Sequence, residues 1–237
     1  MAIRSRRRCT TLRAAAMAMA WMLGGASLAG AQGLQWSGEA ALGSDLTERG
    51  ISPWPGSPVA LGLVAVSDST RWSASLSAAA PLDRGDSRQI VGRGAAYWTL
   101  SQDWQLQARL AFYTYPQGEH RWPYDRTEAT LGAAFRDLVS LEWSAVRLNE
   151  GDSRLYPALD LGLRWPLSEQ WALAGGWGLA ELPAWPGTRY HYGDAGLVWH
   201  AGDWRVSLRY LATGQPVRRL LGKASEAHTS ASITWGF

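Results

Sequence analysis

The sequence predicts a transmembrane antiparallel up-and-down β-barrel of about 12 strands. Three features indicate this fold: an export signal at the N-terminus, a two-residue hydrophobic period through the rest of the chain, and abundant tryptophan. Of the 15 tryptophans, 14 follow residue 31, and indole rings concentrate where a membrane protein meets the lipid–water boundary. After residue 31 we find no apolar run of the ~20 residues that a transmembrane helix requires.

The first 31 residues have the features of a cleaved secretory signal peptide. An apolar run from Ala14 to Leu28 leads into Ala29, Gly30 and Ala31, small residues of the kind that a signal peptidase accepts. The positive charges before this run are Arg4, Arg6, Arg7, Arg8 and Arg13. An uncleaved anchor is the alternative, but the run is shorter than the ~20 residues needed to span a bilayer. We therefore expect export through the Sec pathway and a barrel over residues 32–237.

Charge and cysteine content exclude several classes of partner. Residues 1–31 hold 5 of the 23 basic residues and none of the 20 acidic ones, which leaves 18 basic and 20 acidic residues in the remainder. A nearly neutral chain gives nucleic acid no electrostatic attraction. Cys9, the single cysteine, lies in the signal, so the exported part is expected to have neither disulfide nor thiolate metal site.

A strict two-residue alternation predicts strands with one apolar and one polar face. In 103–113, for example, Trp104, Leu106 and Leu110 share one face, and Gln105 and Arg109 share the other. The same pattern gives twelve strands near the ~9–11 residues that a tilted membrane strand needs. They are 34–44, 57–66, 71–80, 89–100, 103–113, 126–136, 138–147, 154–165, 169–179, 189–200, 203–212 and 226–237.

The connections alternate between tight turns and longer loops, as short periplasmic turns and long external loops do in outer-membrane barrels. The tight turns are Ser67–Thr70, Ser101–Gln102, Arg136–Asp137, Pro166–Ser168 and Ala201–Gly202. The longer loops are 45–56, 81–88, 114–125, 148–153, 180–188 and 213–225. Four strands place tryptophan directly after a tight turn, which predicts an aromatic girdle at the inner interface: Trp72, Trp104, Trp171 and Trp204.

The C-terminus resembles the signal that the barrel-assembly machinery reads on the last strand of its substrates. The chain ends in phenylalanine with apolar residues at alternate positions before it, so Phe237, Trp235 and Ile233 are expected to face lipid. The alternation then places Ser230 and His228 on the face toward the lumen.

Charged residues within the strands are expected to point inward, because an arginine on the lipid face near the midplane costs roughly 2–4 kcal/mol. The alternation gives five acids and five arginines as candidate pore-lining residues. They are Glu39, Arg93, Arg109, Glu128, Glu142, Asp160, Arg164, Asp194, Arg205 and Arg209. This balanced set fits an ion-selective pore lining, and it fits equally a polar interior whose charges pair with one another.

The segment after the first strand reads Arg49-Gly50-Ile51-Ser52, followed by proline and a second strand that begins PVALGL. This pattern resembles the TorF-type porin family of proteobacterial outer-membrane proteins, and the resemblance implies a porin of this length and topology. Arg49 and Gly50 form either a tight bend whose guanidinium folds back over the barrel mouth or an ordinary exposed loop.

One pattern has a catalytic reading. His228 and Ser230 have the His-x-Ser spacing of outer-membrane lipid hydrolases, in which imidazole and hydroxyl on one strand face act as base and nucleophile. Those enzymes need the pair on the lipid side, whereas the register set by Phe237 places both residues inside. The other histidines have no metal-ligand spacing, and we find no phosphate-binding or dinucleotide motif, so no metal and no cofactor is expected.

The leading functional hypothesis is a passive channel for small solutes in the outer membrane, which is not an enzyme. A structural or envelope-interacting barrel without a channel is the alternative, and a lipid hydrolase ranks third. The expected partners are outer-membrane lipid and lipopolysaccharide. External segments rich in proline and aromatic residues, around Trp54, Trp122 and Trp185, either bind ligands such as sugars or stiffen the barrel rim.

Overall fold

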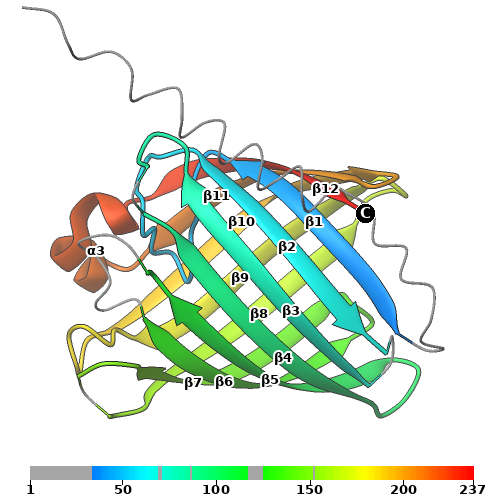
Figure 1. Cartoon of the computed structure of the whole chain (residues 1–237), viewed down its shortest axis with the longest axis horizontal. Helices are drawn as coiled ribbons and strands as arrows, with labels where there is room; N and C mark the ends of the chain where they lie inside the picture. The colour runs from blue at the N-terminus through cyan, green and yellow to red at the C-terminus, as the bar shows by residue number, and fades with distance from the viewer. Residues whose placement is uncertain (1–33, 69–70, 86, 117–124, 152) are drawn as a thin grey trace, which may run out of the picture. The chain divides into compact units, whose positions relative to one another are not determined.

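The chain forms a closed antiparallel barrel of twelve strands, as the sequence predicts (Figure 1). The computed structural model describes residues 34–68, 71–85, 87–116, 125–151 and 153–237. The expected signal peptide and Trp122 lie outside the described residues.

Each strand lies within two residues of its expected ends, and each pairs with its neighbours in the sequence. The strands are β1 (Gln35–Gly43), β2 (Val59–Ser67), β3 (Trp72–Pro81), β4 (Gln89–Thr99), β5 (Trp104–Thr114), β6 (Arg126–Phe135), β7 (Val139–Leu148), β8 (Tyr156–Pro166), β9 (Trp171–Glu181), β10 (Arg189–Ala201), β11 (Trp204–Thr213) and β12 (His228–Gly236).

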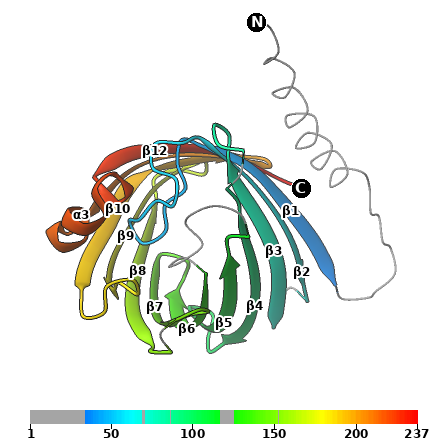
Figure 2. The same cartoon turned by 60° about the vertical axis from the view of Figure 1, so that its left-hand side comes forward.

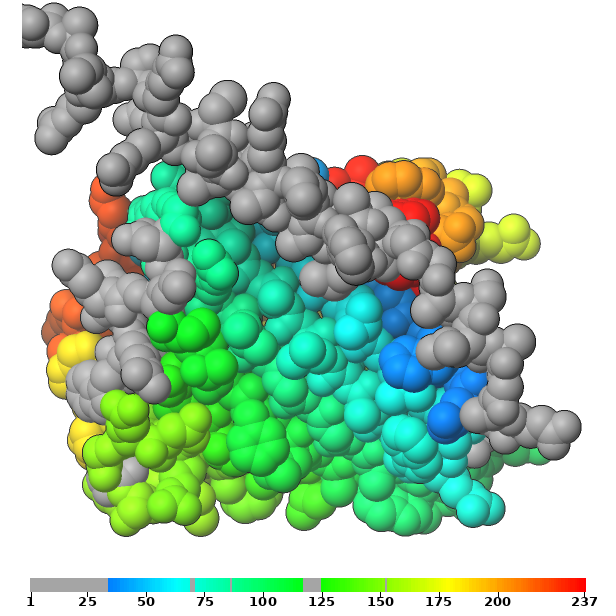
Figure 3. Space-filling view, in the orientation of Figure 1, coloured from blue at the N-terminus to red at the C-terminus, as the bar shows by residue number. Residues whose placement is uncertain are grey.

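The outer face of the barrel is apolar. The outward positions of the strands carry large exposed side chains, among them Leu76, Leu106, Leu110, Phe112, Leu131, Leu141, Leu163, Leu173, Leu197 and Leu208. The four tryptophans that follow tight turns are 40–48% exposed. The wall formed by β2 to β5 is a continuous surface of side chains (Figure 3). An exposed apolar surface of this extent is typical of a barrel that spans a membrane. Among the described residues, no helix is long and apolar enough to cross a membrane.

The last external loop differs from the sequence-based expectation. We expected an irregular loop over 213–225, but it contains helix α3 (Gln215–Leu221) and a 3₁₀ turn, η1 (Gly222–Ser225). Proline near the first position suits a helix start, because its missing N–H is unpaired there in any helix. A helix of 7 residues is too short for its apolar period to be recognised in sequence, and the burial of Val217 at 0% exposure stabilises it.

The barrel closes by pairing of β1 with β12, and the C-terminal residue extends this seam. Gly38 N–H donates to the Phe237 carbonyl oxygen at 2.8 Å, and Phe237 N–H donates back at 3.0 Å. The Phe237 ring covers Gly38 so closely that a Cβ added there would collide with it. An aromatic ring over a strand glycine fills the space that the missing side chain leaves.

We expect Gly38→Val to destabilise the closed barrel by about 1–3 kcal/mol, because the added methyl groups must displace the Phe237 ring. Heat-modifiable gel mobility and urea unfolding of the refolded protein would measure the loss. Gly62→Val is the matched control, because it adds the same side chain to neighbouring β2 where a Cβ meets nothing within 4 Å. Equal stability of the two variants would contradict the role assigned to the Phe237 contact.

Candidate functional site

The first long loop, residues 45–56, folds into the barrel instead of extending from it, and we call it the inserted loop. Its tip is a tight hairpin in which Glu48 and Ile51 exchange backbone hydrogen bonds of 2.9 Å. Arg49 and Gly50 between them have φ values of 49° and 76°. Two consecutive left-handed residues are typical of the tight turn that matches the twist of a hairpin.

Glycine is required at the second turn position for space as well as for conformation. A Cβ on Gly50 would collide with the methyl group of Thr213 and would lie 3.0 Å from the Cβ of Tyr192. The turn therefore lies directly against the inner face of β10 and the end of β11.

Arg49 attaches the inserted loop to the opposite wall. Its guanidinium donates to both carboxylate oxygens of Glu128 on β6, with one of the bonds at 3.2 Å. Its Nε donates to Asp160 on β8 at 3.3 Å, and the hydroxyl of Tyr192 donates to the same carboxylate. Burial lowers the pKa of Arg49, but Glu128 and Asp160 outweigh that effect and hold the pKa above its ordinary value. The guanidinium is therefore a permanent cation at the centre of two carboxylates.

The neighbouring Glu48 makes a second connection across the lumen. It accepts from Arg126 at 2.6 Å and from Gln89 at 3.0 Å. Arg126 also lies 3.7 Å from the ring centroid of Tyr113, a cation–π contact. Arg49 of the loop thus pairs with carboxylates of the wall, and Glu48 of the loop pairs with an arginine of the wall.

Sequence reasoning missed three members of this arrangement: Glu48, Arg126 and Tyr192. The two-residue period could have identified two of them. Arg126 lies two positions before Glu128, and Tyr192 lies two positions before Asp194, so each shares the inward face of a candidate residue. Glu48 had no such signal, because a loop has no register.

The base of the inserted loop is fixed at the barrel rim. Ser52 donates from its hydroxyl to Asp45 at 2.6 Å and from its backbone N–H to the Ala224 carbonyl of η1 at 2.7 Å. Trp54, 4% exposed, packs with Val59, Ala79 and Tyr115. Trp54 is therefore packed inside the rim, while Trp185 is 39% exposed.

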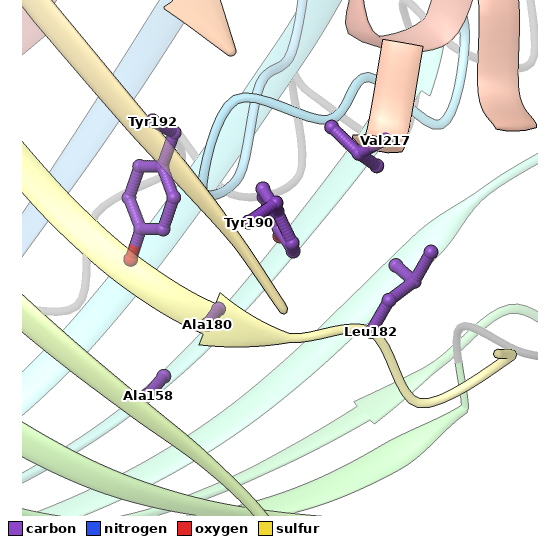
Figure 4. Packing of buried hydrophobic residues seen from close by; sticks show 6 residues of the cluster. All are labelled: Ala158, Ala180, Leu182, Tyr190, Tyr192 and Val217. Atoms are coloured by element: carbon purple, nitrogen blue, oxygen red, sulfur yellow. The ribbon is translucent and has the colours of Figure 1, made fainter. Parts of the chain in front are cut away.

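Apolar residues of α3, β10 and the loop after β9 pack together at the external end of the barrel. Val217 of α3 packs with Leu182, Tyr190 and Tyr192, and Ile51 of the inserted loop is packed against this group (Figure 4). The external end is therefore narrowed by apolar packing and by the inserted loop together.

The remaining candidate residues also lie on the inward faces of the strands. Arg109 pairs with Glu142 at 2.7 Å, Arg209 with Asp194 at 3.0 Å, and Arg205 with Glu39 at 3.4 Å. Arg93 donates to the Ser77 hydroxyl at 3.3 Å and approaches the Tyr113 ring. Within the described part of the chain, the guanidinium of Arg164 makes no hydrogen bond or ion pair. The structure thus brings three of these arginines together with acids, gives Arg93 neutral partners, and leaves Arg164 apart.

Two hollows flank this set of charges. One, of about 490 Å³, extends along β7 to β10, where Gly162, Ala174 and Gly176 leave space in the wall, and Arg164 lines it. The other, of about 420 Å³, lies between the inserted loop and β1, β2, β11 and β12. Arg209 lines both hollows. Each is large enough for a small solute.

The possible catalytic pair His228 and Ser230 lies inside the barrel, as its register predicts. The Nδ1 of His228 lies 2.9 Å from the Glu226 carbonyl oxygen, and its Nε2 lies 3.0 Å from the Asp45 carboxylate. With both ring nitrogens directed to these groups, the imidazole is not placed to take a proton from Ser230. Among the residues that the structure describes, no group of three or more His, Cys, Asp or Glu is arranged to hold a metal.

A closed twelve-strand barrel with a charged interior and an inserted loop defines the class: the chain has the fold of the outer-membrane porins. A KdgM porin superposes with a TM-score of 0.57 at 6% identity over 85% of this chain and 99% of that one. A NanC porin gives 0.53 at 9% identity over 84% and 98%. No protein-family model matches the chain, and no curated protein does.

Proposed function

We propose that this protein is a porin-like channel of the bacterial outer membrane that passes small solutes through a lumen narrowed by the inserted loop. The observation that carries the proposal is the interior itself: charged side chains line hollows of about 490 and 420 Å³, and the inserted loop lines the second of them. A barrel that served only as a scaffold would gain more from an apolar core, because buried ion pairs contribute little net stability. The export signal that the sequence predicts over residues 1–31 and the resemblance to the TorF-type porins support the same location.

Single-channel recording of the refolded protein, without residues 1–31, tests the proposal in planar bilayers. Discrete conductance steps are expected, small because the inserted loop occupies the lumen. A folded barrel that adds no conductance would favour the alternative, a structural barrel whose interior charges serve only one another.

The ion preference of the channel depends on the charges that lack partners. Arg109, Arg205 and Arg209 each face a carboxylate, so their fields are partly cancelled. Among the described residues, Arg93 and Arg164 face no carboxylate, whereas the acid Asp137 lines the larger hollow beside Arg164, which leaves two unpaired arginines against one unpaired acid. We therefore propose a weak preference for anions.

We expect Arg164→Gln to move the reversal potential in a KCl gradient toward the value for cations, because it removes an unpaired positive charge. The control removes a whole pair, Arg109→Gln with Glu142→Gln, and should leave the reversal potential unchanged since the net charge is the same. A larger shift in the control than in Arg164→Gln would assign the selectivity to the paired residues instead.

A further inference from the structure

The segment 214–225, which contains α3 and η1, is strongly basic, and we call it the basic segment. It carries Arg218, Arg219 and Lys223 and has no acidic residue. All three cations are exposed. Lys223 is the single lysine of the whole chain. A net charge of this size within six residues is a strong local electrostatic feature.

Other external segments have no comparable excess. Segment 82–88 has two acids and two arginines, segment 149–155 has two acids and one arginine, and segment 182–188 has no charge. The nearest acids on adjoining elements also leave the excess in place. Glu181 is engaged by Arg154 at 3.6 Å and by the Gly187 N–H at 2.9 Å, and Glu226 is one acid against three cations.

The basic segment has an ordered backbone, which sets where these cations leave the surface. Val217 is fully buried beside them. Ser225, also fully buried, donates to the carbonyl oxygens of Val217 and Gly222 at 3.3 Å each and accepts from Thr213 through its own carbonyl. The cations therefore lose little conformational freedom as a group when they bind a ligand.

The segment lies at the external end of the barrel, where β11 ends and β10 begins (Figures 1 and 2). Gly214 at its start packs against the outward-facing His191 of β10. Below it on β11, Leu208 and Tyr210 are 53% and 57% exposed on the outer face. Gly214 follows Tyr210 by four residue steps, which corresponds to roughly 13 Å of rise along the strand. The outer wall thus passes from aliphatic to aromatic to cationic side chains, the order in which a bilayer passes from acyl chains to headgroups.

We infer that the basic segment binds the phosphate groups of lipopolysaccharide in the outer leaflet. Guanidinium groups bind phosphate oxygens by paired hydrogen bonds, and Lys223 supplies a point charge beside them. Leu220, 43% exposed among these cations, suits a surface that adjoins acyl chains. The inference rests on the proposed outer-membrane location but not on an open channel.

Native mass spectrometry of the refolded barrel in detergent tests the inference with two probes, phosphorylated lipid A and the same lipid with its phosphates removed. We expect phosphorylated lipid A to bind at least tenfold more tightly, and added NaCl to weaken that binding. Arg218→Gln with Arg219→Gln and Lys223→Gln should reduce the affinity at least tenfold while heat-modifiable mobility is retained. The matched control neutralises three exposed arginines outside the basic segment, Arg84 and Arg88 of segment 82–88 and Arg147 at the end of β7, and should bind as the wild type does.

Equal binding of the two lipids, or equal loss in the matched control, would overturn the inference. Binding that needs the three cations but not the lipid phosphates would point to an acidic macromolecule instead, and would also overturn it. If the variant proved unfolded, the comparison of the two lipids and the salt dependence on wild-type protein would still decide. Absence of conductance with intact lipid A binding would reject the channel and leave this inference standing.

Discussion

Replacement of residues 44–58 by Asn-Gly is expected to raise the single-channel conductance several-fold, because it removes the inserted loop from the lumen. The barrel offers a clean junction for this change. Gly43 on β1 pairs with Val59 on β2, so a two-residue turn with left-handed Asn-Gly geometry can join the two strands directly.

The wall residues that lose loop partners have alternatives. Arg126 loses Glu48 but already lies 3.8 Å from Glu128, which itself loses Arg49. Asp160 keeps the hydroxyl of Tyr192. The barrel should therefore fold without the loop, and heat-modifiable mobility would verify this before recording.

Replacement of residues 183–187 by Asn-Gly is the matched control, and it keeps Leu182 in the apolar packing at the external end. Leu182 and Thr188, on either side of the removed residues, are joined by a backbone hydrogen bond of 2.9 Å. The conductance of this variant should stay near that of the wild type. If both shortened barrels fold and conduct equally, the inserted loop is not the constriction, and the narrowing would have to come from the ion pairs of the strands.

Sequence patterns predicted the strands and their faces because apolar and polar residues alternate within each strand, and this alternation shows which residues face lipid and which face the lumen. An inward residue such as Glu142 is placed by neighbours one position away, and a slip of one residue would expose every apolar side chain to the lumen. For the same reason the alternation of short and long connections could be read from the sequence alone.

The inserted loop could not be predicted in the same way, because its position depends on partners far along the chain. Arg49 meets Glu128 and Asp160 at sequence separations of 79 and 111 residues. The sequence indicated a tight bend at Arg49-Gly50 as one of two alternatives, but it held no information on which carboxylates the guanidinium would reach. The pairing of Arg109 and Arg209 is similar: alternation placed them inside, and only the closed barrel shows that each has an acid beside it.

The second large effect is expected from Arg49→Ala, which should lower the free energy of unfolding by about 3–5 kcal/mol. Arg49 is 19% exposed and Glu128 6%, so the substitution removes a cation from two poorly hydrated carboxylates. Urea unfolding of the refolded barrel in phospholipid vesicles, followed by tryptophan fluorescence, would measure the loss. By contrast, Arg205→Ala should cost less than about 1 kcal/mol, because that arginine and Glu39 are 53% and 40% exposed.

A compensated variant distinguishes the effect of the unpaired carboxylates from the effect of losing the other contacts of the Arg49 side chain. Arg49→Ala combined with Glu128→Gln and Asp160→Asn removes the carboxylates that the arginine neutralises. If uncompensated charge is the cause, this variant should recover most of the stability lost in Arg49→Ala alone. Both Arg49→Ala and the compensated variant should conduct more than the wild type, because the inserted loop has lost its attachment to β6 and β8. A loss below 1 kcal/mol in Arg49→Ala, with conductance unchanged, would mean that the rim contacts of Ser52 and Trp54 hold the loop without help from the guanidinium.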